Sequence, residues 1–186
     1  MFVLYYLRDL CQLILAPLKG WEDIAADCFD PRRLLTHGLL PFLAFTALTV
    51  WVRAFYVVEV SVAAFIEQMI VCFIKYFATY FCALFFFTLY LPVCIEGELS
   101  ISRCHTFIAY GVGLLALIDV LQNCIPVELS LVYVMPVYAV YIMWRALRYL
   151  GISFGGVGKF LMLIIFTIVM PPYLLQYLFN LIIPQT

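Results

Sequence analysis

Charged side chains are scarce in this sequence: 11% of the 186 residues are Asp, Glu, Lys or Arg, whereas 67% are apolar. Soluble domains carry roughly a quarter charged residues and about half apolar ones, so this composition excludes an ordinary water-soluble domain. The formal net charge of −1 offers no argument for a nucleic-acid partner, and none is predicted. The composition predicts a membrane protein.

Motifs of catalysis and metal binding are missing as well. The sequence has no HExxH motif, and its seven cysteines include no CxxC pair. The segment "GGVGK" at 155–159 lacks the spacing of a phosphate-binding loop. The segment "GISFG" at 151–155 matches the G-x-S-x-G string, with Ser153 at its centre, but it joins two expected membrane helices instead of a strand and a helix. We therefore expect no enzymatic activity, no cofactor and no metal site.

Long apolar runs divide most of the chain into segments near the ~20 residues that a helix needs to cross a bilayer. Such segments must satisfy their own backbone hydrogen bonds, so helices are expected. The predicted fold class is all-α: a polytopic integral membrane bundle of five transmembrane helices preceded by an interfacial amphipathic helix. Residues 1–30 are predicted to form cytoplasmic-face interfacial helices, and residues 31–186 the transmembrane domain. The five predicted spans are 31–57, 66–92, 104–123, 129–149 and 159–183.

Several helix ends and bends can be assigned from single residues. Asp30 before Pro31 predicts a capped helix start, Ser102 is a candidate cap for the third span, and Gly151 suits the end of the fourth. Prolines inside the spans predict kinks, because proline cannot donate the helical hydrogen bond. These prolines are Pro41, Pro136, Pro171 and Pro172.

Lys and Arg are unevenly distributed along the chain, and positively charged connections tend to stay in the cytoplasm. With a cytoplasmic amino terminus and an external carboxyl terminus, eight of the ten bases lie on the cytoplasmic side. These eight are Arg8, Lys19, Arg32, Arg33, Arg103, Arg145, Arg148 and Lys159. We predict an integral protein of the inner membrane of a bacterium in this orientation.

The first 30 residues are predicted to lie on the membrane without crossing it. Arg8, Asp9 and Gln12 fall within one narrow arc of a helix, the rest of which is apolar, and Pro17 ends that helix early. Aromatic and basic residues gather at membrane interfaces. The residues predicted to anchor this region at the interface are Trp21, Arg32 and Arg33.

The connector after the leader resembles the Ypt-interacting-protein (Yip) domain family in its prokaryotic form. The similarity lies in an apolar leader, a P-x-x-G/A-W-E-x-I connector at 17–24, and five spans, with Tyr138, Tyr141 and Gly151 near the end of the fourth. The resemblance covers nearly the whole chain. It implies a non-enzymatic five-span membrane protein, and its eukaryotic relatives are linked to Rab-type GTPases, vesicle traffic and membrane shaping.

Ionisable side chains inside spans are costly, and they are usually paired or functional. Arg53, Lys75 and Asp119 form such a set, expected in the outer halves of the first three spans. One interpretation, which we favour, is an ion pair that ties helices together, with the bases reaching outward. The other is a polar site for an ion or solute.

Two function classes follow from these features. The first is a non-enzymatic membrane scaffold that organises or shapes the bilayer, and the second is a small channel or transporter that uses Arg53, Lys75 and Asp119. The expected partner is the lipid bilayer, and a second copy of the chain or other membrane proteins are further candidate partners. A strip of small residues on the third span, at positions 109, 113 and 116, suits either internal packing or dimerisation.

Overall fold

The computed structural model describes residues 2–27, 30–56, 61–93, 100–125, 130–152 and 154–182, and its elements are all helical. The leader contains α1 (Phe2–Leu15) and α2 (Pro17–Asp27). The rest of the chain continues as α3 (Pro31–Leu34), η1 (Leu35–Leu39), α4 (Leu40–Thr49), η2 (Val50–Phe55), α5 (Val62–Tyr90), η3 (Leu91–Val93), α6 (Ile101–Cys124), α7 (Ser130–Trp144), α8 (Leu147–Leu150), η4 (Phe154–Gly156), α9 (Val157–Ile164), η5 (Ile165–Val169) and α10 (Met170–Ile182).

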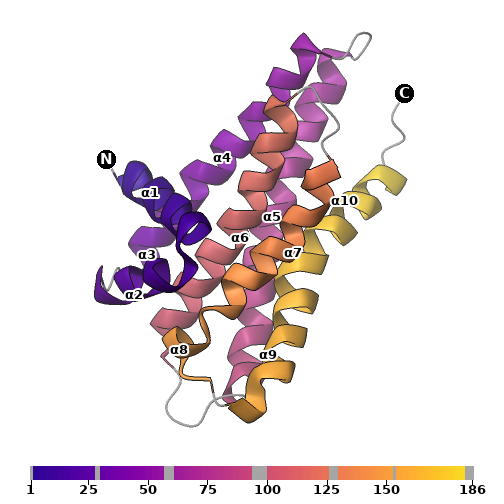
Figure 1. Cartoon of the computed structure of the whole chain (residues 1–186). Helices are drawn as coiled ribbons and strands as arrows, with labels where there is room; N and C mark the ends of the chain where they lie inside the picture. Colours follow the sequence, from indigo (N-terminus) through magenta and orange to yellow (C-terminus); the bar gives the residue numbers. More distant parts are fainter. Residues whose placement is uncertain are drawn as a thin grey trace.

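Four helices are long and apolar enough to cross a membrane, by length and composition (Figure 1). They span Pro31–Arg53, Val62–Tyr90, Ile101–Cys124 and Val157–Ile182. They correspond to the first, second, third and fifth predicted spans, with ends shifted by a few residues. The start of α5 moves to Val62 because Ser61 caps it, its hydroxyl oxygen accepting from the Ala64 N–H at 3.2 Å.

Over the described residues, the predicted fourth span, 129–149, is a 15-residue helix followed by a turn and a short helix, and not one continuous helix. Helix α7 ends at Trp144 after 15 residues, a length of roughly 22 Å against the ~30 Å of a bilayer core. The chain then turns at Arg145 and Ala146, whose N–H groups donate to carbonyls three residues back. The short helix α8 follows and ends at Gly151, whose φ of 70° lies in the left-handed region.

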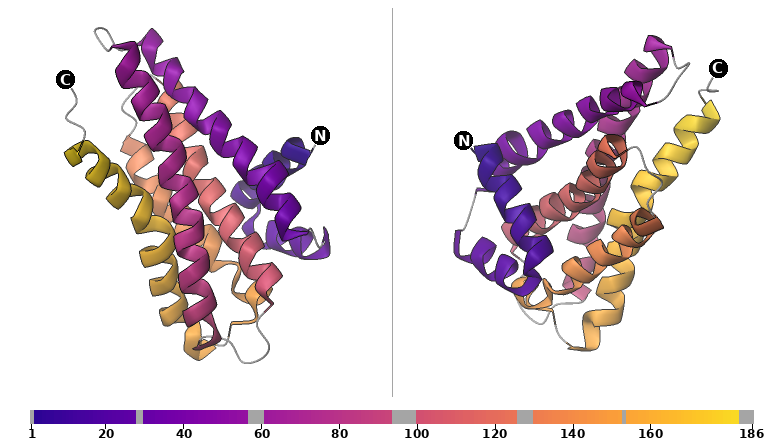
Figure 2. Two further views of the ribbon diagram at one scale, coloured as in Figure 1. Left: turned by 180° about the vertical axis from the view of Figure 1, so that it is seen from behind. Right: turned by 45° about the horizontal axis from the view of Figure 1, so that its top comes forward.

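Two of the predicted proline positions follow π-helical turns. The segment η1 ends shortly before Pro41, and η5 ends shortly before Pro171. A proline removes an N–H and crowds the carbonyl four residues earlier, and a wider π turn relieves that crowding. The ribbon bends visibly between α9 and α10 (Figure 2).

Of the predicted helix caps, Asp30 is confirmed, and Ser102 is wrong. The Asp30 carboxylate accepts from the Arg32 N–H at 3.1 Å, with Pro31 in the first helical position. Helix α6 begins at Ile101 with Ser100 at its N-cap, so Ser102 already lies inside the helix. Its hydroxyl is therefore too late in the chain to satisfy the free N–H groups at the start.

Helix α6 forms the centre of the bundle. It is the most buried of the long helices, with 72% of its apolar window inside the protein, against 28–44% for the others. It contacts α4, α5 and α7 around its circumference (Figure 2). The leader packs on the flank of the bundle, α1 against η1 and α6, and α2 against α8. Both helices of the leader thus lie on protein along one side.

Candidate functional site

A largely buried ion pair joins α5 to α6. Lys75 Nζ lies 2.5 Å from Asp119 Oδ2, and the two side chains are only 11% and 18% exposed. Charged groups removed from water in this way need both a counter-charge and further hydrogen bonds. Two of the three ionisable side chains that the sequence singles out, Lys75 and Asp119, are thus in direct contact.

Polar side chains from a third helix complete this cluster. Lys75 Nζ also donates to Gln176 Oε1 at 3.3 Å, and the Gln176 amide nitrogen donates to Asn180 Oδ1 at 3.2 Å. On α5, Cys72 Sγ donates to Asp119 Oδ2 at 3.8 Å. Residues three or four apart share one helix face, which explains why Cys72 and Lys75, and likewise Gln176 and Asn180, point the same way. The cluster fixes α5, α6 and α10 against one another.

Arg53 does not join the cluster. It lies exposed in η2, and within the described residues it makes no ion pair with Asp119. Lys75 lies near the midpoint of the long helix α5. Sequence reasoning missed Gln176 and Asn180, although amides inside an apolar span are an available signal.

A second polar contact holds α4 to α6. Asn123 Nδ2 donates to Thr49 Oγ1 at 3.0 Å, and both side chains are buried. Asn123 follows Asp119 by four residues, so both lie on one face of α6. Polar groups along this face therefore serve as contacts between helices.

Hydrogen bonds attach α1 to the middle of α6. The Tyr6 hydroxyl donates to the Ala109 carbonyl at 2.8 Å, and the Tyr110 hydroxyl donates to Asp9 Oδ2 at 2.9 Å. Asp9 Oδ1 accepts from Arg8, which neutralises a carboxylate that is 3% exposed. Burial raises the pKa of the Tyr6 hydroxyl well above its usual value, so this group stays protonated as a donor. Asp9, predicted on the polar arc, faces protein because Tyr110 satisfies it.

Tyr6 also occupies the strip of small residues on α6. A Cβ added at Gly113 would collide with the Tyr6 hydroxyl oxygen and come within 3.1 Å of its Cζ. Ala109 supplies the carbonyl that the same hydroxyl bonds. Of the two predicted uses of this strip, internal packing accounts for the contacts in the described residues.

Trp21, which was predicted to anchor the leader at the membrane interface, is buried in the protein. Its side chain is 2% exposed and lies against Phe107 and Tyr149, with ring centroids 5.5 and 5.4 Å away. Its Nε1–H donates to the Ile142 carbonyl at 2.9 Å, so both the ring and the polar tip have protein partners. Arg32 and Arg33 remain exposed on the first turn of α3.

A substitution at Trp21 tests how far this contact holds the leader. Trp21→Phe keeps most of the ring contact and leaves the Ile142 carbonyl without its donor. We expect a loss of about 1 kcal/mol in the free energy of unfolding, measured by thermal unfolding in detergent. Trp51→Phe is the control, because Trp51 lies exposed on η2. Equal losses in the two variants would contradict the assigned contact.

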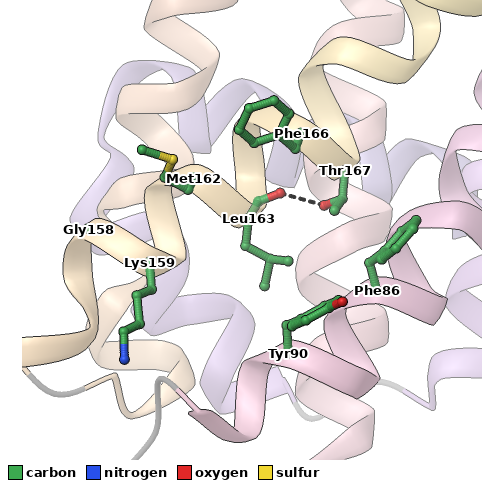
Figure 3. Close-up of a pocket in the computed structure, with 8 residues that line it drawn as sticks. All are labelled: Phe86, Tyr90, Gly158, Lys159, Met162, Leu163, Phe166 and Thr167. Atoms are coloured by element: carbon green, nitrogen blue, oxygen red, sulfur yellow. Dashed lines mark hydrogen bonds between the residues drawn. The ribbon is translucent and has the colours of Figure 1, made fainter.

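An apolar groove of about 720 Å³ lies between the end of α5 and α9–η5 (Figure 3). Phe86 and Tyr90 line one side, and Met162 and Phe166 the other. Lys159 stands at one end of the groove. Met162, Phe166 and Tyr90 are largely exposed, so the groove is part of the outer apolar surface of the bundle.

Searches of protein-family models, curated proteins and solved structures found no match to this chain. Ser153, the centre of the G-x-S-x-G string, lies outside the described residues. His105, near the start of α6, shares a hydrogen bond between its Nδ1 and the Tyr80 hydroxyl at 2.8 Å. The geometry of the helices and their polar contacts is thus the basis for a functional assignment.

Proposed function

We propose that this chain is a non-enzymatic integral membrane protein of the Yip-domain type, which organises or shapes the membrane at its cytoplasmic face. One observation carries the proposal. The leader is fixed to the bundle by one face and exposes apolar side chains on the other, Leu4 at 70% and Leu15 at 85%. An amphipathic element held in this way would act as a rigid wedge in one leaflet.

The course of the chain supports five crossings of the membrane. Helix α6 ends near the end of the bundle where α4 and α5 meet, and α9 starts at the opposite end, close to α8 (Figure 1). Helix α7 runs between these ends, which supports a return of the chain across the bundle. Its 15 residues are short for a bilayer core, which fits a thinned or locally deformed membrane beside it.

A topology map tests this arrangement. We expect cysteine labelling or reporter fusions to place residues 1–30 and 152–157 in the cytoplasm, and residues 59–65 and 185–186 outside. The physical reason is the retention of basic connections on the cytoplasmic side. Both termini on one side of the membrane would contradict five crossings.

Reconstitution into liposomes tests the activity itself. A scaffold should change vesicle shape or size in proportion to the protein added and leave ion and solute gradients intact. A variant with Leu4→Ser and Leu15→Ser should lose the shape change, because it removes the exposed apolar surface of the leader. Unchanged vesicles with the wild-type protein would contradict the proposal.

A small channel or transporter is the second candidate. The polar cluster of Lys75, Asp119, Gln176 and Asn180 favours it, since ionisable groups inside spans often mark transport pathways. The same liposomes, loaded with ions or a pH gradient, would show flux in this case. Lys75 and Asp119 neutralise each other in direct contact, which supports the scaffold instead.

A further inference from the structure

A pocket of about 200 Å³ lies where α2, the first turn of α6 and the turn between α7 and α8 meet. Three of the side chains that line it are arginines: Arg103, Arg145 and Arg148. The volume is below the ~300–1,000 Å³ typical of sites for drug-sized ligands, so the pocket suits a small charged group. The cytoplasmic end of the bundle thus concentrates positive charge in a concave site.

Neighbouring aromatic residues hold two of these arginines in place. Arg103 Nη1 donates to the Tyr149 carbonyl at 3.2 Å, and its guanidinium lies over the Tyr149 ring at 5.8 Å. Arg145 Nε donates to the Tyr141 hydroxyl at 3.1 Å, and its guanidinium lies over the Tyr141 ring at 5.2 Å. Stacking and one hydrogen bond orient the guanidinium group of each of these two arginines and leave further N–H groups free to bind a ligand.

The positive charge of the pocket is only partly balanced. Glu22 is the acidic side chain among the lining residues, and it is exposed. In the part of the chain that the structure describes, none of the three arginines forms a salt bridge. Among the described residues that line the pocket, three bases therefore face one acid, and this excess of positive charge favours an anion.

We propose that Arg103, Arg145 and Arg148 bind a phosphate group. Arginine forks match the geometry of phosphate oxygens, and charge-assisted hydrogen bonds are about twice as strong as neutral ones. The phosphate belongs either to the headgroup of an anionic lipid in the adjacent leaflet or to a soluble phosphate compound. The inference goes beyond the proposed function, because the pocket could bind phosphate in a scaffold or in a transporter.

Binding to the full-length protein in an uncharged detergent tests the site. One arm titrates short-chain phosphatidic acid and reads bound lipid by native mass spectrometry, and the other titrates inorganic phosphate by calorimetry. Tighter binding of phosphatidic acid identifies a lipid headgroup as the source, and equal or tighter binding of inorganic phosphate identifies a soluble compound. Failure of both probes to saturate would overturn the inference, whatever the flux and shape assays give.

Three substitutions make the test specific. Arg148→Gln should weaken the bound probe about tenfold, because it removes one charge-assisted contact, while the exposed position leaves the fold intact. Arg33→Gln removes the same charge outside the pocket and should change affinity less than about twofold. Glu22→Gln should tighten binding several-fold, which a damaged fold cannot do. Equal losses for Arg148→Gln and Arg33→Gln would show nonspecific attraction and overturn the site.

Discussion

Asp119→Asn should lower the free energy of unfolding by about 3 kcal/mol, the lower end of the range for breaking a buried ion pair. The substitution leaves the Lys75 ammonium buried without its counter-charge, although Gln176 still accepts one of its hydrogen bonds. For a chain of this size, that loss corresponds to a fall of roughly 6–12 °C in the midpoint of thermal unfolding. Thermal unfolding in detergent measures it directly.

The double variant Lys75→Met with Asp119→Asn should recover most of this stability. Methionine keeps the length and volume of the lysine stem without a charge, so no unpaired ion remains in the interior. Arg53→Gln combined with Asp119→Asn is the matched control. Because Arg53 is exposed on η2 and does not contact Asp119, its effect should simply add to that of Asp119→Asn. Coupling to Arg53 and none to Lys75 would contradict the assigned pair.

The same variants separate the two function classes. A scaffold should keep its effect on vesicle shape in the stable Lys75→Met/Asp119→Asn double variant, because its working surface is the leader. A transporter would recover its fold and lose its flux, since the polar site itself has been removed. Wild-type flux that disappears in this stable double variant would overturn the scaffold.

The long helices could be predicted from the sequence because length and hydropathy alone determine whether a segment can cross a bilayer. The break after α7 could not be predicted, since the run from 129 to 149 is apolar throughout most of its length. Next to the turn that ends α7, the Trp21 indole N–H donates to the Ile142 carbonyl, a contact between residues 121 positions apart. Hydropathy carries no information about such a partner.

The candidate site was only partly predictable for a similar reason. The free-energy cost of placing a charge in a membrane singles out Arg53, Lys75 and Asp119. Which of the two bases pairs with Asp119 depends on which faces of α5 and α6 pack together. The periodicity of the leader predicts its helix correctly but does not show what Asp9 contacts. A polar arc is the same whether Asp9 faces water or, as in the structure, the Tyr110 hydroxyl. Local sequence patterns therefore cannot show when a polar residue is hydrogen-bonded by a side chain from a distant segment.

Gly113→Ala should detach the leader from the bundle, at a cost of about 1–3 kcal/mol for overpacking a closed contact. The added Cβ would collide with the Tyr6 hydroxyl, which cannot retreat without losing its hydrogen bond to the Ala109 carbonyl. Hydrogen exchange across α1 should therefore increase, while exchange in α5 stays near the wild-type rate. Gly158→Ala is the control, because a Cβ there meets nothing within 4 Å.

Tyr6→Phe should partly rescue the Gly113→Ala variant. Alone, Tyr6→Phe removes one buried hydrogen bond and should cost about 1 kcal/mol. In the Gly113→Ala background it removes the hydroxyl that meets the new methyl group, so the double variant should be more stable than the sum of the single losses predicts. If the losses in the free energy of unfolding are additive and hydrogen exchange in α1 is unchanged, the absence of a side chain at Gly113 is not what accommodates Tyr6. The rigid attachment of the leader, on which the proposed membrane wedge depends, would then lack its central contact.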